Sequence, residues 1–255
     1  MKPAAIFRTA VLLIPALTAS LASAAPSIPA YISAAVADSA RPAEDKQRDA
    51  DRKPAETLAF AGVKPGDTVM EIAPGKGYYT RLLSAVVGPK GKVYAVTSPP
   101  QPDKTPPPVQ AIAADPHFSN VTVILQRVAD LKLPEGTKLP HDVNLVWTSL
   151  NYHDFHNIAD VDVGTINRAM FAALRPGGTF FVLDHAAEAG SGTRDTNTLH
   201  RIDEETVKQE GTAAGFKLVG ESDILRNKSD PHTAKVFDPE IRGHTDQFAL
   251  KFSKP

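Results

Sequence analysis

A short apolar run that ends in a glycine turn constrains this chain more than any other feature. Residues 68–72 have the pattern of a buried strand, and Gly75 and Gly77 follow directly. Tyr78 then opens a stretch suited to a helix. Glycines let the backbone approach a ligand, and a helix N-terminus presents free amides to it. The pattern therefore predicts a doubly wound α/β domain with a ligand bound on this turn.

The turn lacks two common nucleotide-binding signatures. Ala73 occupies the place of the first glycine of G-x-G-x-x-G, and residues 78–80 supply no third glycine. No Gly-Lys-Ser/Thr follows, so the turn is not a phosphate-binding loop. What remains is an acidic residue, Glu71, followed after one position by a small residue and then by Pro-Gly-x-Gly.

This shape resembles motif I of the class I S-adenosylmethionine-dependent methyltransferases. Residues 142–149 resemble the fourth strand of that fold, and residues 173–182, with Leu-Arg-Pro-Gly-Gly, resemble the next turn and strand. The resemblance implies an α/β fold with a Rossmann-like sheet of seven strands and helices on both faces. It also implies S-adenosylmethionine as cofactor and methyl transfer as the activity.

From Gly66 onward the chain alternates in the manner of βαβ units. Strands are predicted at residues 68–72, 92–96, 121–125, 143–148, 179–184, 217–221 and 247–252. Helices are predicted near residues 78–87, 109–114, 161–174 and 204–214. The proline-rich residues 98–108 are predicted to form a loop. Residues 227–244 are a long insertion, either a solvated excursion or a lid over the site.

The first residues have the composition of a secretory signal peptide. Two basic residues precede an apolar run over residues 10–21, and Ala-Ser-Ala at 22–24 forms a small-x-small cleavage site. We expect residues 1–25 to be a cleaved signal peptide, with no stable membrane anchor and a mature protein in the bacterial periplasm. The absence of cysteine is compatible with that compartment. S-adenosylmethionine is made in the cytosol, so an exported enzyme depends on how the cofactor reaches it.

Two segments precede the first strand. Residues 26–43 are rich in alanine and proline and are predicted to be a loosely held lead-in, with the methyltransferase-like domain at residues 44–255. Residues 44–53 are highly charged and contain one apolar residue, Ala50, which favours a solvated helix face.

The charge balance of the chain limits the kinds of molecule that it is expected to bind. The chain has 28 basic and 29 acidic residues, so no overall field attracts nucleic acid. Apolar and aromatic residues near the predicted crevice make a small molecule the expected substrate. The sequence leaves the oligomeric state open.

The resemblance assigns cofactor contacts along the carboxyl edge of the sheet. Family members usually end the second strand with an acidic residue that binds the ribose hydroxyls, and Thr97 stands there in this chain. A hydroxyl replaces only part of that interaction, with a loss on the order of 1–3 kcal/mol. Asp130 lies where a family acidic residue meets the adenine amino group, although a solvated turn aspartate fits equally well. The predicted cofactor-binding residues are Glu71, Ala73, Gly75, Gly77, Thr97, Asp130 and Asn151.

A group of titratable side chains follows the fourth and fifth predicted strands. Its members are His153, Asp154, Asp184, His185 and His200. The loops at the carboxyl ends of parallel strands meet at one edge, so we expect these residues in one crevice. In a methyltransferase, His153, Asp154 or His185 would take a proton from the acceptor, while transfer itself needs in-line positioning. These three are the predicted catalytic residues.

Two other interpretations of this group stay open. Imidazoles and a carboxylate can bind zinc or another divalent ion and support hydrolysis. No compact signature such as His-Glu-x-x-His is present, so no metal ligands are assigned. A protein that retained the fold without the chemistry would instead bind a small molecule, since histidine beside aspartate is often only a hydrogen-bonded pair. Fold alone does not decide between these functions.

Overall fold

The computed structural model describes residues 28–102, 104–131 and 139–255, so the predicted signal peptide at residues 1–25 lies outside the described residues. The strands are β1 (Thr68–Ile72), β2 (Lys92–Thr97), β3 (Val121–Leu125), β4 (Val143–Ser149), β5 (Leu174–His185), β6 (Lys217–Ser222) and β7 (Gln247–Ser253). They form one sheet in the order β3-β2-β1-β4-β5-β7-β6. β7 runs antiparallel to β5 and β6, and the other pairs are parallel. All seven predicted strands are confirmed.

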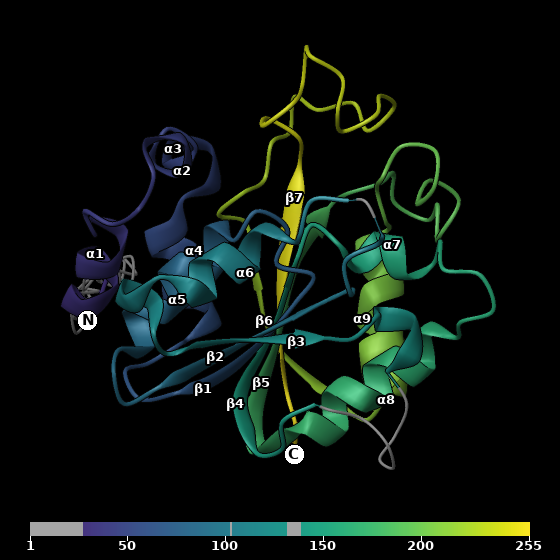
Figure 1. The fold of residues 1–255 in the computed structure, drawn as a ribbon. Coiled ribbons are helices and arrows are strands. Elements are labelled where there is room, and N and C mark those ends of the chain that lie inside the picture. The colour runs from purple at the N-terminus through teal and green to yellow at the C-terminus, as the bar shows by residue number, and fades with distance from the viewer. Residues whose placement is uncertain (1–27, 103, 132–138) are drawn as a thin grey trace, which may run out of the picture.

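Helices cover both faces of the sheet, as predicted (Figure 1). One face carries α1 (Ala30–Val36), α4 (Pro54–Ala61), α5 (Tyr78–Val87) and α6 (Pro108–Ala114). The other carries α8 (Val163–Ala173) and α9 (Glu204–Ala213). Shorter elements are α2 (Ala43–Lys46), α3 (Asp49–Arg52), α7 (Tyr152–Phe155), η1 (Pro116–Phe118) and η2 (Val128–Asp130). Within the described ranges, no helix is long and apolar enough to cross a membrane.

The Leu-Arg-Pro-Gly-Gly segment is part of β5 rather than a turn before it. Leu174 already pairs with Val143 of β4, so the strand begins earlier than Thr179, where it was predicted to start. The Gly177 N–H donates to the Lys254 carbonyl at 2.8 Å. Gly177 has a φ of 73°, which a glycine adopts without a steric penalty. The irregular backbone is therefore hydrogen-bonded into the sheet.

The described part of the predicted lead-in is not loosely held. Ile32 of α1 is fully buried, and α1 packs against α4 and α5. Arg41 is buried as well, and its guanidinium lies 2.6 Å from the Asp49 carboxylate. Ile28, Ile32 and Val36 recur every four residues, so the sequence does carry an apolar signal for this helix, but the alanine- and proline-rich composition outweighed it in the prediction.

The charged segment at residues 44–53 was predicted to be a solvated helix face, but part of it is buried against the rest of the fold. Asp45 is buried and lies 2.9 Å from the Arg81 guanidinium of α5. The Tyr78 hydroxyl donates to Asp49 at 2.7 Å. The Arg52 guanidinium lies over the Tyr78 ring, 4.5 Å from its centroid. The segment therefore docks on the start of α5 through charges and aromatic faces, and hydrophobic periodicity carries no signal for such contacts.

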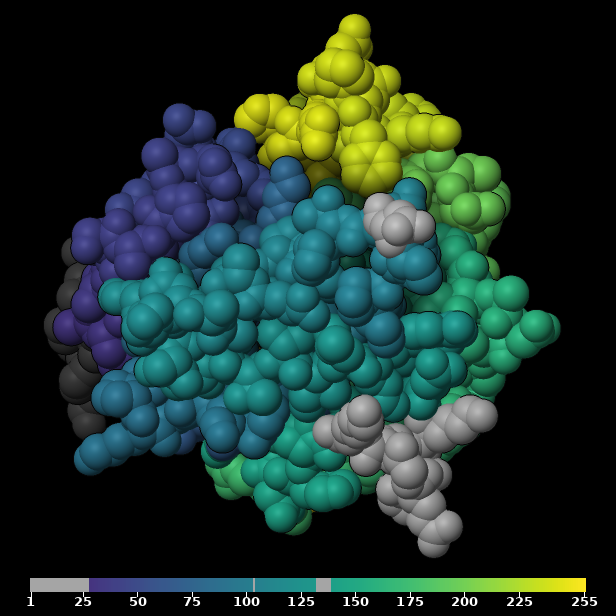
Figure 2. All heavy atoms as spheres, viewed as in Figure 1, coloured from purple at the N-terminus to yellow at the C-terminus, as the bar shows by residue number. Residues whose placement is uncertain are grey.

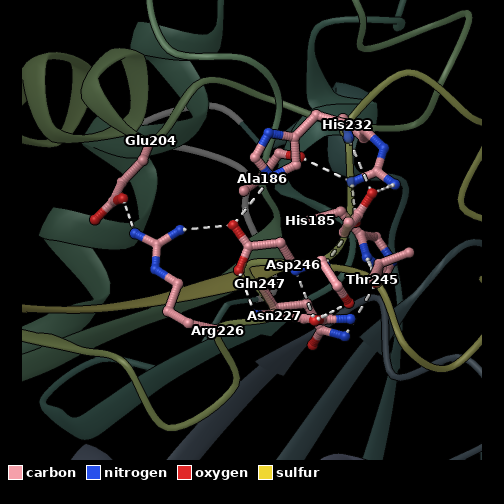
Figure 3. A network of polar contacts seen from close by, with 12 residues as sticks. His185, Ala186, Glu204, Arg226, Asn227, His232, Thr245, Asp246 and Gln247 are labelled. Carbon is pink, nitrogen blue, oxygen red and sulfur yellow. Dashed lines mark hydrogen bonds and ion pairs between the residues drawn. The ribbon is translucent and has the colours of Figure 1, made fainter.

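A polar network fastens the insertion at residues 227–244 to the sheet (Figure 3). Asp246 accepts the Asn227 N–H at 2.7 Å and lies 3.0 Å from His232 Nε2. The fully buried Arg201 guanidinium pairs with Asp230 at 2.8 Å. The insertion is thus pinned at its base over the carboxyl edge of the sheet.

The packing of α1 generates a first prediction. Ile32→Ala should lower the free energy of unfolding by about 2–5 kcal/mol, because it leaves a cavity between α1 and the core. Urea denaturation measures the change. Val219→Ala, at a position 49% exposed in β6, is the control and should cost less than about 1 kcal/mol. Equal small losses in both variants would contradict the docking of α1.

Candidate functional site

The glycine turn follows β1, in the middle of the sheet. Gly75 and Gly77 both have positive φ, 56° and 79°. A Cβ placed on Gly75 would meet no atom within 4 Å, whereas one on Gly77 would lie 2.1 Å from Ile112 Cδ1. Gly75 therefore borders open space, whereas a side chain at Gly77 would meet the end of the Ile112 side chain of α6 and would be strained at this φ. A ligand can approach the backbone closely at Gly75.

Asn151 connects this turn to the segment after β4. Its Nδ2 donates to the Ala73 carbonyl at 3.0 Å, and the Ala73 N–H donates to Val96 of β2. Ala73 and Leu150 have left-handed φ values of 53° and 57°, which cost a non-glycine residue on the order of 1 kcal/mol each. Strained backbone thus lies on both sides of the Asn151 contact.

Thr97 and Asp130 lie along the same edge, as the sequence predicts. Thr97 ends β2 and is half-buried, and its carbonyl accepts the Gln126 N–H at 2.8 Å. The Asp130 side chain is 56% exposed and lies 3.5 Å from Arg127 Nε. Both side chains are accessible to a ligand, and their roles stay predictions.

Glu71 is buried beneath the glycine turn. Its carboxyl group accepts a hydrogen bond from Thr80 Oγ1 at 2.6 Å, which holds the end of β1 to the first turn of α5. Burial raises the pKa of Glu71 to about 7, because the charged form loses its hydration. The carboxyl group is therefore mostly protonated in the folded chain below neutral pH.

A pocket of 230 Å³ lies next to this edge, beyond Leu150. Three parts of the chain line it: the charged N-terminal segment, the segments that follow β4 and β5, and the insertion at residues 227–244. Figure 2 shows the insertion, in yellow, beside the N-terminal segment, in purple, at this end of the molecule. The three predicted catalytic residues, His153, Asp154 and His185, all line this pocket.

Asp184 holds His153 from behind. Asp184 is fully buried, and its two carboxylate oxygens accept from His153, one contacting Nδ1 and the other the backbone N–H, each at 2.8 Å. Burial alone would lower the pKa of His153, but the charge and hydrogen bond of Asp184 outweigh burial and raise it above its ordinary value. The same contact keeps the pKa of Asp184 low despite its burial. Nε2 of His153 then lies on the side of Asp154, 3.4 Å from its Oδ1.

The other two histidines of the group differ in their environments. His185 Nδ1 lies 2.7 Å from Thr245 Oγ1 (Figure 3), and burial lowers the pKa of His185 to about 4. His185 is therefore neutral at pH 7. His200 Nδ1 lies 3.5 Å from Asp154 Oδ1, and its ring packs against Phe237 of the insertion. His153, Asp154 and His185 meet at the pocket as predicted, whereas Asp184 lies behind His153 and His200 contacts Asp154 without lining the pocket.

The pocket is also lined by three arginines to which the sequence analysis assigned no role. They are Arg48, Arg52 and Arg242. Among the described residues, the guanidinium groups of these three have no carboxylate within ion-pair distance. Arg48 and Arg52 are four residues apart, a spacing that puts both on one face of a helix, and this was the one available signal.

The environment of Glu71 generates the second prediction. A carboxyl group whose pKa rises on folding stabilises the folded chain below pH 4.5 and loses that effect as pH rises through about 7. Glu71→Gln keeps an acceptor for Thr80 but cannot ionise. Its stability relative to the parent chain should improve by about 2–3 kcal/mol between pH 4 and pH 8, as measured by urea denaturation. Exposed Glu56→Gln is the control, and a flat difference for both variants would contradict a neutral Glu71.

Comparisons with known proteins reach the same fold. No family model matches the chain. A demethylmenaquinone methyltransferase of Symbiobacterium thermophilum is 29% identical over 132 residues, which is 51% of this chain and 47% of that protein. A ubiquinone/menaquinone biosynthesis C-methyltransferase of Ectopseudomonas mendocina is 27% identical over 137 residues, 50% of this chain and 45% of that protein. The chain thus spans about half the length of the curated relatives it matches.

A solved structure extends the likeness over most of the chain. A S-adenosylmethionine-dependent methyltransferase of Aquifex aeolicus superposes with a TM-score of 0.57 at 18% identity, covering 84% of this chain and 99% of that one. At this identity the likeness concerns the fold. Together with the strand order, in which antiparallel β7 lies between β5 and β6, it places the chain among proteins with the class I S-adenosylmethionine-dependent methyltransferase fold.

Proposed function

We propose that this chain transfers a methyl group from S-adenosylmethionine to a small anionic molecule. The observation that carries the proposal is the adjacency of two regions on one sheet edge. The open glycine turn and the pocket of histidines and arginines meet at Asn151 and Leu150. The two relatives, both named as methyltransferases, favour this activity over a hydrolase or a non-catalytic binder.

The cofactor side of the proposal uses the predicted residues. When bound, S-adenosylmethionine supplies an electrophilic methyl group. The open space at Gly75 fits a ligand that lies against the backbone, and Glu71 supports the turn from beneath. Thr97 and Asp130 would contact the adenosyl portion from the ends of β2 and β3. Asn151 would separate cofactor from acceptor.

The acceptor side is argued from charge. Desolvation lowers the pKa of half-buried Arg52, so an anionic partner would be favourable there. Arg48 and Arg242 add positive charge at the same pocket. His153, Asp154 and His185 would lie against the reacting end of the acceptor. Methyl transfer requires mainly in-line positioning, which charge-assisted contacts with the arginines would provide.

Cofactor binding is tested at Gly75. Gly75→Val should abolish the binding of S-adenosylmethionine seen by titration calorimetry, because a branched side chain fills the space where the ligand meets the backbone. Gly66→Val is the control, since Gly66 also has positive φ and open space but precedes β1 at its opposite end. Thermal melts establish that both variants fold. Unchanged binding in Gly75→Val would contradict the site, and no binding by the parent chain would contradict the function.

The acceptor class is tested at Arg52. Arg52→Met should reduce kcat/KM for acidic acceptors by on the order of 10–100-fold, since a charge-assisted hydrogen bond contributes about 1.5–3 kcal/mol. The assay follows labelled methyl transfer to a panel of small carboxylic acids and their neutral amides. Exposed Arg175→Met, at the other end of β5, serves as control. Equal losses for acids and amides would refute an anionic acceptor.

A further inference from the structure

We propose that His153, Asp154 and His200 bind a divalent metal ion of the zinc type. The ligand atoms come from α7 and from the segment between β5 and α9, and they lie within 4.8 Å of one another. The proposal rests on these side chains and on their surroundings. It does not depend on methyl transfer.

The distances between the three side chains fit shared coordination better than direct hydrogen bonding. Asp154 Oδ1 lies 3.4 Å from His153 Nε2 and 3.5 Å from His200 Nδ1. Hydrogen bonds between such groups are usually shorter, about 2.7–3.0 Å. Zinc binds nitrogen and oxygen ligands at about 2.0–2.2 Å in a tetrahedron, whose edge is then about 3.3–3.6 Å. The two separations from Asp154 match that edge, and the two imidazole nitrogens lie within 4.8 Å of each other.

Asp184 supplies the outer-shell contact that a metal-binding histidine requires. Its carboxylate engages Nδ1 of His153 at 2.8 Å, so in the neutral ring Nδ1 carries the proton and Nε2 presents a lone pair. Metal-ligating histidines generally donate their second ring N–H to a carboxylate or a carbonyl group. Asp184 is itself fixed by the backbone N–H groups of His153 and His185. The direction of His153 is therefore set before any ion binds.

His200 is held in place by an unusual backbone conformation. Its φ of 56° is left-handed, which is costly for a residue with a side chain. The next residue, Arg201, is fully buried and pairs with Asp230, and the Leu199 carbonyl accepts the Val236 N–H. Phe237 packs edge-on against the His200 ring, with centroids 4.8 Å apart. The insertion thus keeps His200 turned toward Asp154.

The ligand set indicates the class of ion. Two imidazole nitrogens and one carboxylate oxygen suit zinc and similar divalent transition metals, whereas magnesium and calcium prefer oxygen ligands. His153 and Asp154 also line the 230 Å³ pocket, so a fourth coordination position would face its interior. An oxygen anion held by the arginines of that pocket is the class of molecule that would fill this position.

The experiment is a titration of the chelator-treated full chain with zinc, followed by calorimetry, and with cobalt(II), followed by visible absorption. The expected result is one ion per chain with a tetrahedral cobalt spectrum. His200→Ala and Asp154→Asn should each weaken binding by on the order of 10–100-fold or more. His117→Ala, which removes an exposed histidine paired with Asp38, is the matched control and should bind as the parent does.

Two outcomes would overturn the metal site. One is the absence of stoichiometric zinc binding by the parent chain. The other is binding that His200→Ala leaves unchanged, which would place the ion elsewhere. Failure of the metal site is distinguished from failure of the proposed function by titrating S-adenosylmethionine into the metal-free parent chain and into metal-free His200→Ala. A chain that binds cofactor but no zinc loses only the metal site, and one that binds zinc but no cofactor loses only the methyltransferase.

Discussion

The buried carboxylate of Asp184 is the constraint on which the functional end of this molecule depends. A carboxylate with no solvent exposure is stable only when hydrogen bonds replace its hydration. Asp184 obtains them from the backbone N–H groups of His153 and His185 and from the His153 imidazole. These contacts hold α7 against the end of β5 and set the direction of the His153 ring, whereas the His185 ring contacts Thr245. The pocket wall is thus a consequence of satisfying one charge at the end of a central strand.

The other two walls of the pocket, the N-terminal segment and the insertion, are also held by charged side chains, which lie far from Asp184 in the sequence. Arg41 and Asp49 pair with each other, and Asp45 pairs with Arg81 of α5. These pairs dock the N-terminal segment and leave Arg52 without an acidic partner among the described residues, over the Tyr78 ring. On the opposite side, buried Arg201 and Asp230 pin the insertion. Both segments are held by partly or fully buried ion pairs. Removal of one partner of such a pair leaves an unpaired buried charge, which is strongly destabilising. Single substitutions far from the pocket surface should therefore disturb the structure of the pocket.

The sequence predicts the sheet well because central parallel strands are buried on both faces and therefore appear as continuous apolar runs. The grouping of His153, Asp154 and His185 was also predictable, since the loops after β4 and β5 must meet at one edge. The docking of residues 43–53 was not, because it depends on ion pairs that have no period, whereas α1 carried an apolar period in Ile28, Ile32 and Val36 that its alanines and prolines outweighed. The approach of His200 to Asp154 was not predictable either, since it depends on a left-handed backbone and on the insertion. Export of the chain and the separate cofactor contacts stay predictions.

The two roles considered for His153 follow from one geometry. A carboxylate on Nδ1 makes Nε2 a better proton acceptor and equally a better metal ligand, so the Asp184 contact cannot discriminate between them. The surroundings of Nε2 do discriminate, because a free base needs only one proton donor in reach, whereas here a carboxylate and a second imidazole converge on the same point. A bound ion would also make a separate base unnecessary, since a metal lowers the pKa of an oxygen acid that it coordinates. Metal binding and methyl transfer are therefore compatible. The ion and the arginines would hold an ionised acceptor beside Asn151, and S-adenosylmethionine bound at the glycine turn would supply the methyl group.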